Sequence, residues 1–453
     1  MGAIKNILLV SANKYTVPYP VYPLGITYLY TYLTKRLTDH YIRIFDFNFQ
    51  SVSDFTALLE SEKFDLVGVS LRNIDDTNIY TQNSFISWYK QIIEMIRANS
   101  SAKIVLGGPG FSIFPEQIFE LLGADFGIKG EGEESLLQLI SSLESNSEID
   151  QIEGLVYKKT GETRINGRKS YLNSLEASFD SDLIKYYWDK SGMLNIQTKR
   201  GCPYNCIYCS YPVIEGSIVR TLDTRLIVEN LKDLYFNNGI SYVFFTDSVF
   251  NISREYNLKL ANEIIESGVK INWGAYFSPH NLSRKELELF KKAGLSHIEF
   301  GTESFSNQQL RNYRKHFTFE EVLEVSDICS DLGIFFAHFL ILGGYGETEE
   351  SLDETFSNSK KIPLSVYFPY IGMRIYPNTE LYNISIKEGK IKNVNDLLDP
   401  VYYISKEVNI DSIKERAMAT GMKWIFPDYD DKGMIEKFRS RNKKGPLWEY
   451  LRF

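Results

Sequence analysis

Three of the four cysteines lie within eight positions, in the segment KRGCPYNCIYCSYP. They are Cys202, Cys206 and Cys209, with the spacing C-x3-C-x2-C. Three thiolates on one loop can bind three irons of a cubane cluster, which leaves the fourth iron without a protein ligand. The spacing therefore predicts a [4Fe-4S] cluster with one open coordination position.

A structural zinc site is the alternative interpretation of these cysteines. Zinc in that role takes four protein ligands in a closed tetrahedron, and a fourth ligand is missing here. Cys329 lies far along the chain in a helix-like segment, where we expect a buried free thiol. The five histidines show no metal-ligand spacing with the cysteines. The cluster is favoured, and zinc stays open.

The first 148 residues alternate strand-like apolar runs with amphipathic, helix-like runs. This alternation predicts an α/β domain with a doubly wound, Rossmann-like parallel sheet over residues 1–148. Such sheets bind ligands at the carboxyl ends of their strands. The expected strands are 7–11, 42–47, 66–71, 104–106 and 126–128, and the expected helices are 24–37, 53–60, 83–98, 115–122 and 133–143.

The alternation resumes after residues 149–192, which we expect to form a polar hairpin and linker. Six βα units then predict a partial (βα)6 barrel over 193–385, with its chemistry at the carboxyl ends of the strands. The cysteines directly follow the first of these strands. Residues 386–453 are assigned to a small C-terminal cap on the substrate side. The expected barrel strands are 194–198, 242–246, 271–275, 297–300, 335–342 and 365–374.

Composition limits the classes of function. A chain of 453 residues is longer than one hydrophobic core usually organises, and its formal charge of -8 argues against broad nucleic-acid binding. The start of the chain lacks the pattern of a signal peptide, and the most apolar stretch, 333–344, is too short to span a membrane. Four cysteines are too few for a disulfide framework. We therefore expect a cytoplasmic protein without a membrane segment.

The cysteine spacing, with Tyr208 directly before the last cysteine, resembles the radical SAM superfamily. The segments VFFTDSVFN, FGTES, HFLILGGYGET and RIYPNTELY follow in the order of that family's motifs, and the resemblance covers about residues 193–385. It implies that S-adenosylmethionine (SAM) chelates the open iron and is cleaved reductively to a radical. The SAM-binding residues that it implies are Tyr208, Asp247, Glu303, Ser304, Gly343 and Gly344.

Each of these residues also has a purely structural interpretation. Asp247 could cap the following helix, and Glu303 could pair with Arg311 or Arg314 at the surface. The glycines of the fifth-strand motif, Gly343, Gly344 and Gly346, could simply form a turn. Both interpretations stay open for each residue.

Small and polar residues follow the expected strands of the first domain. With the segments VPYPVYPLGITYLYTYL and GGPGFSIFPEQIF, the domain resembles the cobalamin-binding domain that precedes the barrel in the cobalamin-dependent branch of the superfamily. A G-x-G-x-x-G pattern after the first strand is missing, so a dinucleotide site is unsupported. The residues implied to face the corrin or its nucleotide tail are Ser70, Arg72, Gly107, Gly108 and Gly130.

The first domain departs from the mutase-type pattern, in which an Asp-x-His-x-x-Gly loop supplies a histidine to cobalt. No histidine occurs before His40. Cobalamin is therefore expected to bind base-off and without a histidine ligand, unless the domain has lost it altogether. Arg72 could lie beneath the cobalt, or it could form a salt bridge with Asp75 or Asp76.

Together the two resemblances imply a cobalamin-dependent methyltransferase that acts on an unactivated carbon of a small molecule or peptide. An electron donor such as flavodoxin or ferredoxin would reduce the cluster. The alternatives are a cyclisation, rearrangement or oxidation with cobalamin bound or lost, and a non-catalytic iron–sulfur or zinc module. Methylthiotransfer is disfavoured because no cysteine precedes Cys202. The substrate is not predicted, and four aromatic residues are either pocket or core: Tyr367, Tyr370, Trp424 and Trp448.

Overall fold

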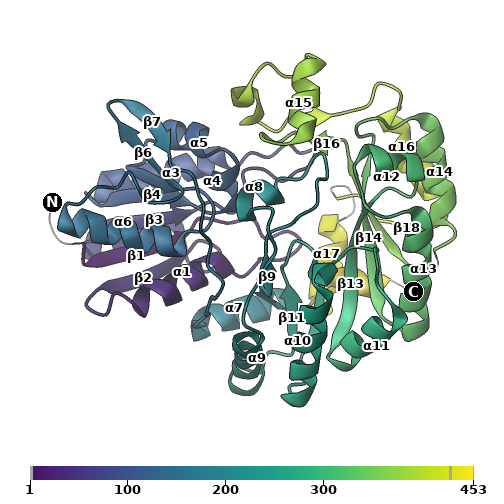
Figure 1. Ribbon diagram of the computed structural model, residues 1–453, viewed down its shortest axis with the longest axis horizontal. Helices are drawn as coiled ribbons and strands as arrows, with labels where there is room; N and C mark the ends of the chain where they lie inside the picture. Colours follow the sequence, from purple (N-terminus) through teal and green to yellow (C-terminus); the bar gives the residue numbers. More distant parts are fainter. Residues whose placement is uncertain (1–3, 363, 428–430, 452–453) are drawn as a thin grey trace.

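The computed structural model describes residues 4–362, 364–427 and 431–451. Two seven-stranded sheets organise this part of the chain. Figure 1 shows them side by side, the first in purple and blue on the left and the second in teal and green on the right. The predicted α/β class, with a doubly wound sheet followed by a partial barrel, is confirmed.

The first sheet has the strand order β2-β1-β3-β4-β5-β6-β7, and β1 to β5 are parallel. The chain reverses its direction across the sheet between β1 and β3, which makes this the switch point where ligands bind. The parallel strands are β1 (Asn6–Ser11), β2 (Tyr41–Asp46), β3 (Leu66–Ser70), β4 (Lys103–Gly107) and β5 (Phe126–Ile128). The helices are α1 (Leu24–Thr34), α2 (Val52–Ser61), α3 (Ile86–Asn99), α4 (Pro109–Ile113), α5 (Pro115–Leu122) and α6 (Glu133–Ser145).

The expected hairpin exists, but it belongs to the first sheet. Strand β6 (Leu155–Lys159) pairs antiparallel with β5, and β7 (Glu162–Ile165) pairs antiparallel with β6. Leu155 and Val156 are fully buried, so the start of β6 covers the edge of β5. This strand has few apolar residues, so the sequence alone could not show that it joins a hydrophobic core.

The second sheet has the order β18-β15-β14-β13-β12-β11-β8 and is parallel throughout. All six expected strands are present, and a seventh, β18, comes from the region assigned to the cap. A two-residue strand carries no periodicity, so the sequence could not predict it. The strands are β8 (Leu194–Ile196), β11 (Tyr242–Phe245), β12 (Asn272–Phe277), β13 (Leu295–Glu303), β14 (Phe335–Leu342), β15 (Val366–Ile371) and β18 (Lys423–Trp424).

Helices cover the outer face of this sheet, and side chains alternate between that face and the barrel lumen. Phe245 and Trp273 point outward and pack with Phe250 and Phe290. The helices of this half are α7 (Ser181–Ser191), α8 (Tyr211–Glu215), α9 (Thr224–Lys232), α10 (Arg254–Glu266), α11 (Arg284–Lys292), α12 (Asn307–Asn312), α13 (Phe319–Leu332), α14 (Glu349–Ser359), α15 (Glu380–Lys387), α16 (Ile413–Ala419) and α17 (Asp431–Ser440).

Smaller elements complete the fold. Two short antiparallel pairs are β9 (Lys199–Arg200) with β10 (Arg220–Thr221), and β16 (Met373–Arg374) with β17 (Tyr402–Tyr403). Helical turns are η1 (Asp233–Asn237), η2 (Phe250–Ile252), η3 (Val394–Leu397), η4 (Ile410–Ser412) and η5 (Leu447–Leu451). Within the described residues, no helix has the length and apolar character needed to cross a bilayer.

Candidate active site

The cysteines lie on the cluster loop, residues 201–210, which follows β9 at the carboxyl end of the first barrel strand. The Cys202 N–H donates to the carbonyl of Gly216 (3.1 Å), and the Cys209 N–H donates to that of Cys206 (3.2 Å). Burial raises the pKa of the Cys209 thiol to about 12, and the charges of the other two cysteines add to this effect. The loop therefore gathers three thiols in one partly buried place.

The arrangement of these thiols distinguishes a cluster from zinc. A single metal ion needs its ligand atoms around one point, and the described residues contain no group of three or more His, Cys, Asp or Glu placed in that way. A cubane instead takes each thiolate on a separate iron. Cys329 is buried in the core on α13 and supplies no fourth ligand. Three thiols on one loop fit a cubane cluster with one open iron, whereas a closed zinc tetrahedron would need a fourth protein ligand.

Two of the predicted SAM residues contact each other beside the cluster loop. The Tyr208 hydroxyl donates to Glu303 Oε1 (2.7 Å), and Lys315 Nζ lies 3.4 Å from both the Tyr208 oxygen and Glu303 Oε1. Glu303 has a φ of 69°, at a register shift near the end of β13. Such backbone conformations cost energy and are common at functional sites. Glu303 therefore pairs with neither Arg311 nor Arg314 but with Lys315, which the sequence did not single out.

Asp247 is buried and connects the end of β11 with the segment that follows β8. Its carboxylate accepts hydrogen bonds from the backbone N–H of Thr198 (2.7 Å) and of Lys199 (3.1 Å), and also from the Thr198 hydroxyl. Lys199 Nζ lies 2.8 Å from Asp247 Oδ2, and both side chains are almost completely buried. Asp247 thus anchors the start of the cluster loop and does not cap a helix.

The remaining SAM candidates lie at the ends of β13 and β14. Ser304 is buried, and its hydroxyl is 3.0 Å from that of Thr355 on α14. Gly343 has a φ of 78°, and its N–H donates to the carboxylate of Glu347. Burial raises the pKa of Glu347 to about 8. Glu347 therefore holds the glycine turn in shape, a contact that the motif alone did not reveal.

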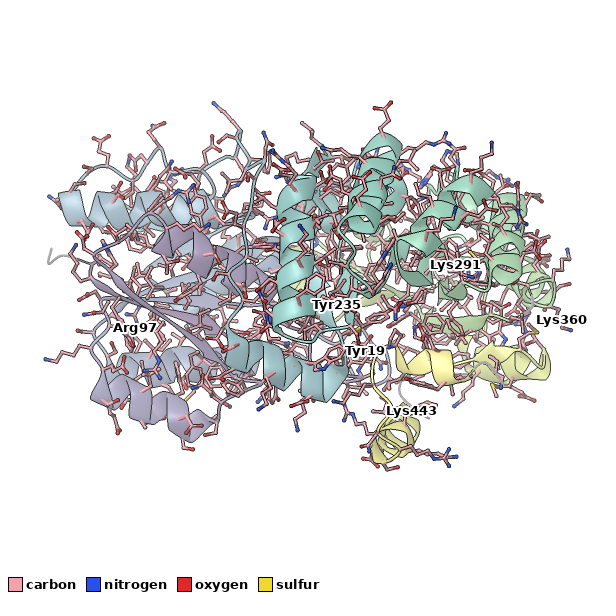
Figure 2. The ribbon with its side chains drawn as sticks, turned by 90° about the horizontal axis from the view of Figure 1, so that it is seen from below. Tyr19, Arg97, Tyr235, Lys291, Lys360 and Lys443 are labelled. Carbon is pink, nitrogen blue, oxygen red and sulfur yellow. The ribbon has the colours of Figure 1, made fainter. Side chains whose placement is uncertain are left out.

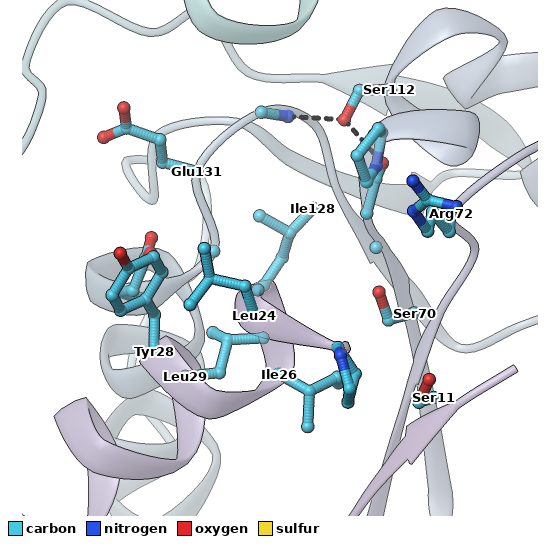
Figure 3. Close-up of a pocket in the computed structure, with 18 of the residues that line it drawn as sticks. Ser11, Leu24, Ile26, Tyr28, Leu29, Ser70, Arg72, Ser112, Ile128 and Glu131 are labelled. Atoms are coloured by element: carbon cyan, nitrogen blue, oxygen red, sulfur yellow. Dashed lines mark hydrogen bonds between the residues drawn. The ribbon is translucent and has the colours of Figure 1, made fainter. Parts of the chain in front are cut away.

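All five residues predicted to face cobalamin line one cavity of about 310 Å³. This interdomain cavity lies between the carboxyl ends of the first sheet and the barrel, and Figure 3 shows residues of its wall on the first domain. Its wall on the first domain includes the predicted residues Ser70, Arg72, Gly107, Gly108 and Gly130, and its wall on the barrel includes Asn195, Gln197, Arg200, Tyr211, Ile214, Glu215 and Thr246.

Bare backbone forms part of the cavity wall. Gly108 has a φ of 91°, and a Cβ there would lie 2.7 Å from the carbonyl oxygen of Leu71 and 2.8 Å from Ser70 Oγ. The Ser112 hydroxyl donates to the Gly108 carbonyl (2.9 Å) and accepts from the Gly130 N–H (2.9 Å), as Figure 3 shows. Ser112 thus links two of the predicted glycines.

Arg72 makes no ion pair among the described residues. Asp75 pairs instead with Arg374 (2.9 Å), and Asp76 accepts from Thr81 and Asn83. Burial lowers the pKa of Arg72, whose guanidinium interacts electrostatically with nearby tyrosines, first among them Tyr276. The alternative of a salt bridge to Asp75 or Asp76 is therefore wrong. The guanidinium of Arg72 is available to a ligand in the cavity.

A buried ionic network joins the two domains beside this cavity. Arg200, two positions before Cys202, lies 3.0 Å from Glu133 and 3.4 Å from Glu131. Arg220 also pairs with Glu131. In the segment that carries Glu131 and Glu133, the sequence points only to Gly130. The ionic partners are far apart in the chain, so spacing could not reveal them.

Comparison with known proteins agrees with this architecture. Residues 10–140 match the B12 binding domain, and residues 196–358 match the radical SAM superfamily. An uncharacterized methyltransferase of Pyrococcus horikoshii is 26% identical over 88% of this chain and 88% of its own length. The tryptophan 2-C-methyltransferase of Streptomyces laurentii is 22% identical over 82% of this chain and 73% of its own length.

A solved structure shares the whole fold. The radical SAM methyltransferase TsrM of Kitasatospora setae, with cobalamin and a [4Fe-4S] cluster bound, superposes with a TM-score of 0.87 at 20% identity, over 100% of this chain and 97% of that one. The cysteine motif, the interdomain cavity and both domain matches lead to one conclusion. The chain joins a B12-binding domain to a radical SAM domain and belongs to the cobalamin-dependent radical SAM enzymes.

Proposed function

We propose that the protein is a methyltransferase that uses a [4Fe-4S] cluster, SAM and cobalamin to methylate an unactivated carbon of a small molecule. The interdomain cavity carries this proposal. Its glycine-lined wall suits a large ligand that lies against backbone, and its barrel wall includes Tyr211, just beyond the cluster loop. Electrostatic interactions connect Tyr211 with both Cys209 and Arg72. Two cofactors placed at these sites would therefore face a common space.

Different side chains would hold the cluster and SAM. Cys202, Cys206 and Cys209 would bind the cluster, and the Tyr208–Glu303–Lys315 group would orient SAM beside it. Bound together, the cofactors supply a radical and a transferable methyl group. The protein's residues position the partners and exclude water.

Arg72 would be one of the residues that hold cobalamin in this cavity. A guanidinium has five N–H donors and no lone pair available to a metal. Arg72 would therefore offer hydrogen-bond donors and a positive charge to the cofactor and would not act as a cobalt ligand. The interdomain cavity has no histidine among the residues that line it, which supports binding of cobalamin without a histidine ligand.

The central experiment is anaerobic reconstitution of the full chain with iron, sulfide and hydroxocobalamin. We expect about four irons per chain and cobalamin that co-elutes with the protein on gel filtration. When the cluster is reduced in the presence of SAM, the protein should release 5′-deoxyadenosine. Replacing all three cluster-loop cysteines with Ala should abolish iron binding and SAM cleavage. Cys329→Ala is the matched control and should keep both, because this cysteine lies in the core.

Methyl-labelled SAM distinguishes methyl transfer from rearrangement or cyclisation. With reduced cobalamin bound, label should move from SAM to the protein-bound cofactor. Iron-replete protein that cleaves SAM but never labels cobalamin would remove the methyl-transfer proposal and leave the radical chemistry intact. A gel-filtration protein peak without cobalamin after incubation with hydroxocobalamin would exclude methyl transfer and rearrangement by way of cobalamin.

A further inference from the structure

The barrel lumen carries polar side chains that belong neither to the cluster loop nor to the interdomain cavity. Tyr276 on β12 and Glu299 on β13 are register partners, so both point into the lumen. Tyr276 is 38% exposed although β12 lies inside the sheet, with neighbours on both sides. The space in front of Tyr276 is therefore open, and its hydroxyl makes no hydrogen bond with the described residues.

Aromatic rings form the wall of this space. Phe244 meets Tyr276 edge to face, with 4.9 Å between ring centroids, and Tyr276 lies 6.5 Å from Phe339. Phe339 in turn stacks on Phe368 at 5.0 Å. Phe339 and Phe368 are only half-buried. A flat ring that entered the lumen would therefore contact aromatic faces and edges along successive strands.

His297 and Trp448 close the floor of the lumen. Gly274, the register partner of His297, makes room for the imidazole, because a Cβ at Gly274 would overlap the ring. Tyr242 hydrogen-bonds with His297, and Trp448 of η5 meets it edge to face with centroids 5.3 Å apart. The floor is thus built from three separate parts of the barrel half.

Glu299 places a carboxylate just above this floor. Its Oε1 accepts a hydrogen bond from the Trp448 indole N–H (3.2 Å), while its Oε2 makes none with the described residues. The His297 imidazole lies 3.8 Å from Glu299 Oε1 and 3.3 Å from Glu449 Oε1, so two carboxylates share one imidazole. No lysine or arginine of the described chain pairs with Glu299, and its side chain is 8% exposed. Burial raises the pKa of Glu299, and the nearby His297 opposes this effect. A buried carboxylate with a free oxygen is a site for a positively charged or N–H group.

The opposite end of the lumen faces the cofactors. Thr246, which lines the interdomain cavity, follows Phe244 of the lumen wall by two positions, so the lumen face of β11 leads to that cavity. Tyr276 also contributes to the electrostatic environment of Arg72, which lines the same cavity. Tyr19, from the loop after β1, interacts with Glu299 and Glu449, and Figure 2 shows it near the middle of the molecule, where the two halves meet. A molecule held at Glu299 would therefore extend along Tyr276 toward the cavity.

We propose that the lumen binds an aromatic small molecule that carries an amine, with its ring against Phe244, Tyr276 and Phe339 and its ammonium group on Glu299. This inference rests on the proposed function, for which it names the substrate class. An ammonium group would bring a positive charge to a floor where Glu299 and Glu449 share one imidazole, and the surrounding rings favour a cation further. An anionic substrate would meet two carboxylates at this floor, Glu299 and Glu449.

Calorimetry with two matched probes tests the proposal on the reconstituted holoenzyme. The probes are 2-(1-naphthyl)ethylamine and 2-(1-naphthyl)ethanol, which share a ring and differ in charge. The wild type should bind the amine about 10-fold or more tightly than the alcohol, as expected for a buried charged hydrogen bond. Glu299→Gln should reduce this ratio to about 2-fold or less. Glu288→Gln, an exposed glutamate on α11, is the control and should keep the wild-type ratio.

Trp448→Phe provides an independent measurement if Glu299→Gln fails to fold. This variant keeps an aromatic ring but removes the hydrogen bond to Glu299, which leaves both carboxylate oxygens for the ligand. Amine binding should tighten by about 2-fold or more, and alcohol binding should stay unchanged. Equal binding of the two probes by the wild type, or an amine preference that survives Glu299→Gln, would overturn the proposal. If SAM cleavage and cobalamin binding by the wild type persist in that case, the proposed function stands without this substrate class.

Discussion

At the residue scale, two buried carboxylates hold strand ends of the barrel in different ways. Asp247 faces the ammonium group of Lys199 and several N–H and O–H donors. Glu347 accepts from the Gly343 N–H, and one of its carboxylate oxygens is buried without a hydrogen-bond partner. Since a charge buried without a cation is unfavourable, Glu347 keeps its proton up to about pH 8. The glycine turn near the SAM candidates thus depends on a neutral acid.

This protonation predicts a pH-dependent stability. The native pKa of Glu347 is about 8, against 4.5 for an ordinary glutamate. The stability that this group contributes is therefore fully present below about pH 4.5 and is lost as pH rises toward 8. Glu347→Gln mimics the neutral acid, so the variant should gain about 2–4 kcal/mol on the wild type between pH 5 and pH 8. Unfolding curves across this range measure the difference, and a constant gap would contradict the prediction.

Residues whose role depends on local spacing were predictable, and residues whose role depends on long-range contacts were not. Cys202, Cys206 and Cys209 share one loop, so their spacing alone indicated a cluster. Lys315 and Arg200 acquire their roles through partners that only the fold brings near. A charged residue in a sequence looks the same whether it lies at the surface or in a buried ion pair.

At the element scale, the turn between β4 and α4 depends on a residue without a Cβ. Gly108→Ala should cost about 1–3 kcal/mol, because the new methyl group would meet the Leu71 carbonyl and the backbone is left-handed there. Hydroxocobalamin should also bind more weakly, since the turn lines the interdomain cavity. Thermal unfolding and equilibrium dialysis measure the two effects.

Gly167→Ala is the matched control for this variant. Gly167 has open space around its Cα and no left-handed φ, so stability and cobalamin binding should both stay close to wild type. Cobalamin binding that is equal in the two variants would separate the β4–α4 turn from the cofactor site.

Elements with several buried residues were predictable within a few positions. The expected strand 335–342 coincides with β14 because its apolar run ends sharply at Gly343. By contrast, β18 pairs through two residues only, Lys423 and Trp424. The aromatic residues that the sequence left as either pocket or core also separate. Tyr367 and Trp424 pack together at 4.7 Å in the core outside the lumen, whereas Trp448 closes the lumen floor.

At the scale of the whole molecule, the buried ionic network fixes the cluster loop to the cobalamin domain. Removing one partner of a buried ion pair leaves the other charge uncompensated, which typically costs about 3–5 kcal/mol. Arg200→Met should therefore destabilise the protein by about this amount and should lower its iron and cobalamin content together. Arg225→Met removes an exposed ion pair with Asp223 and should cost less than about 1 kcal/mol.

Thermal unfolding, iron analysis and cobalamin absorbance of the two variants test this coupling. Loss of iron with full cobalamin binding in Arg200→Met would show that the two sites are independent. Similar unfolding temperatures for both variants would show that the network contributes little to the contact between the domains.

The position of Tyr19 has a consequence for how such enzymes diversify. This residue belongs to the first domain. Burial raises its pKa, and the charges of Glu299 and Glu449 in the barrel half raise it further. If the lumen binds the substrate as proposed, both domains contribute to substrate choice. A chimera that joined this barrel to the first domain of a distant relative would then place a different residue at the position of Tyr19, and we expect it to bind the substrate more weakly.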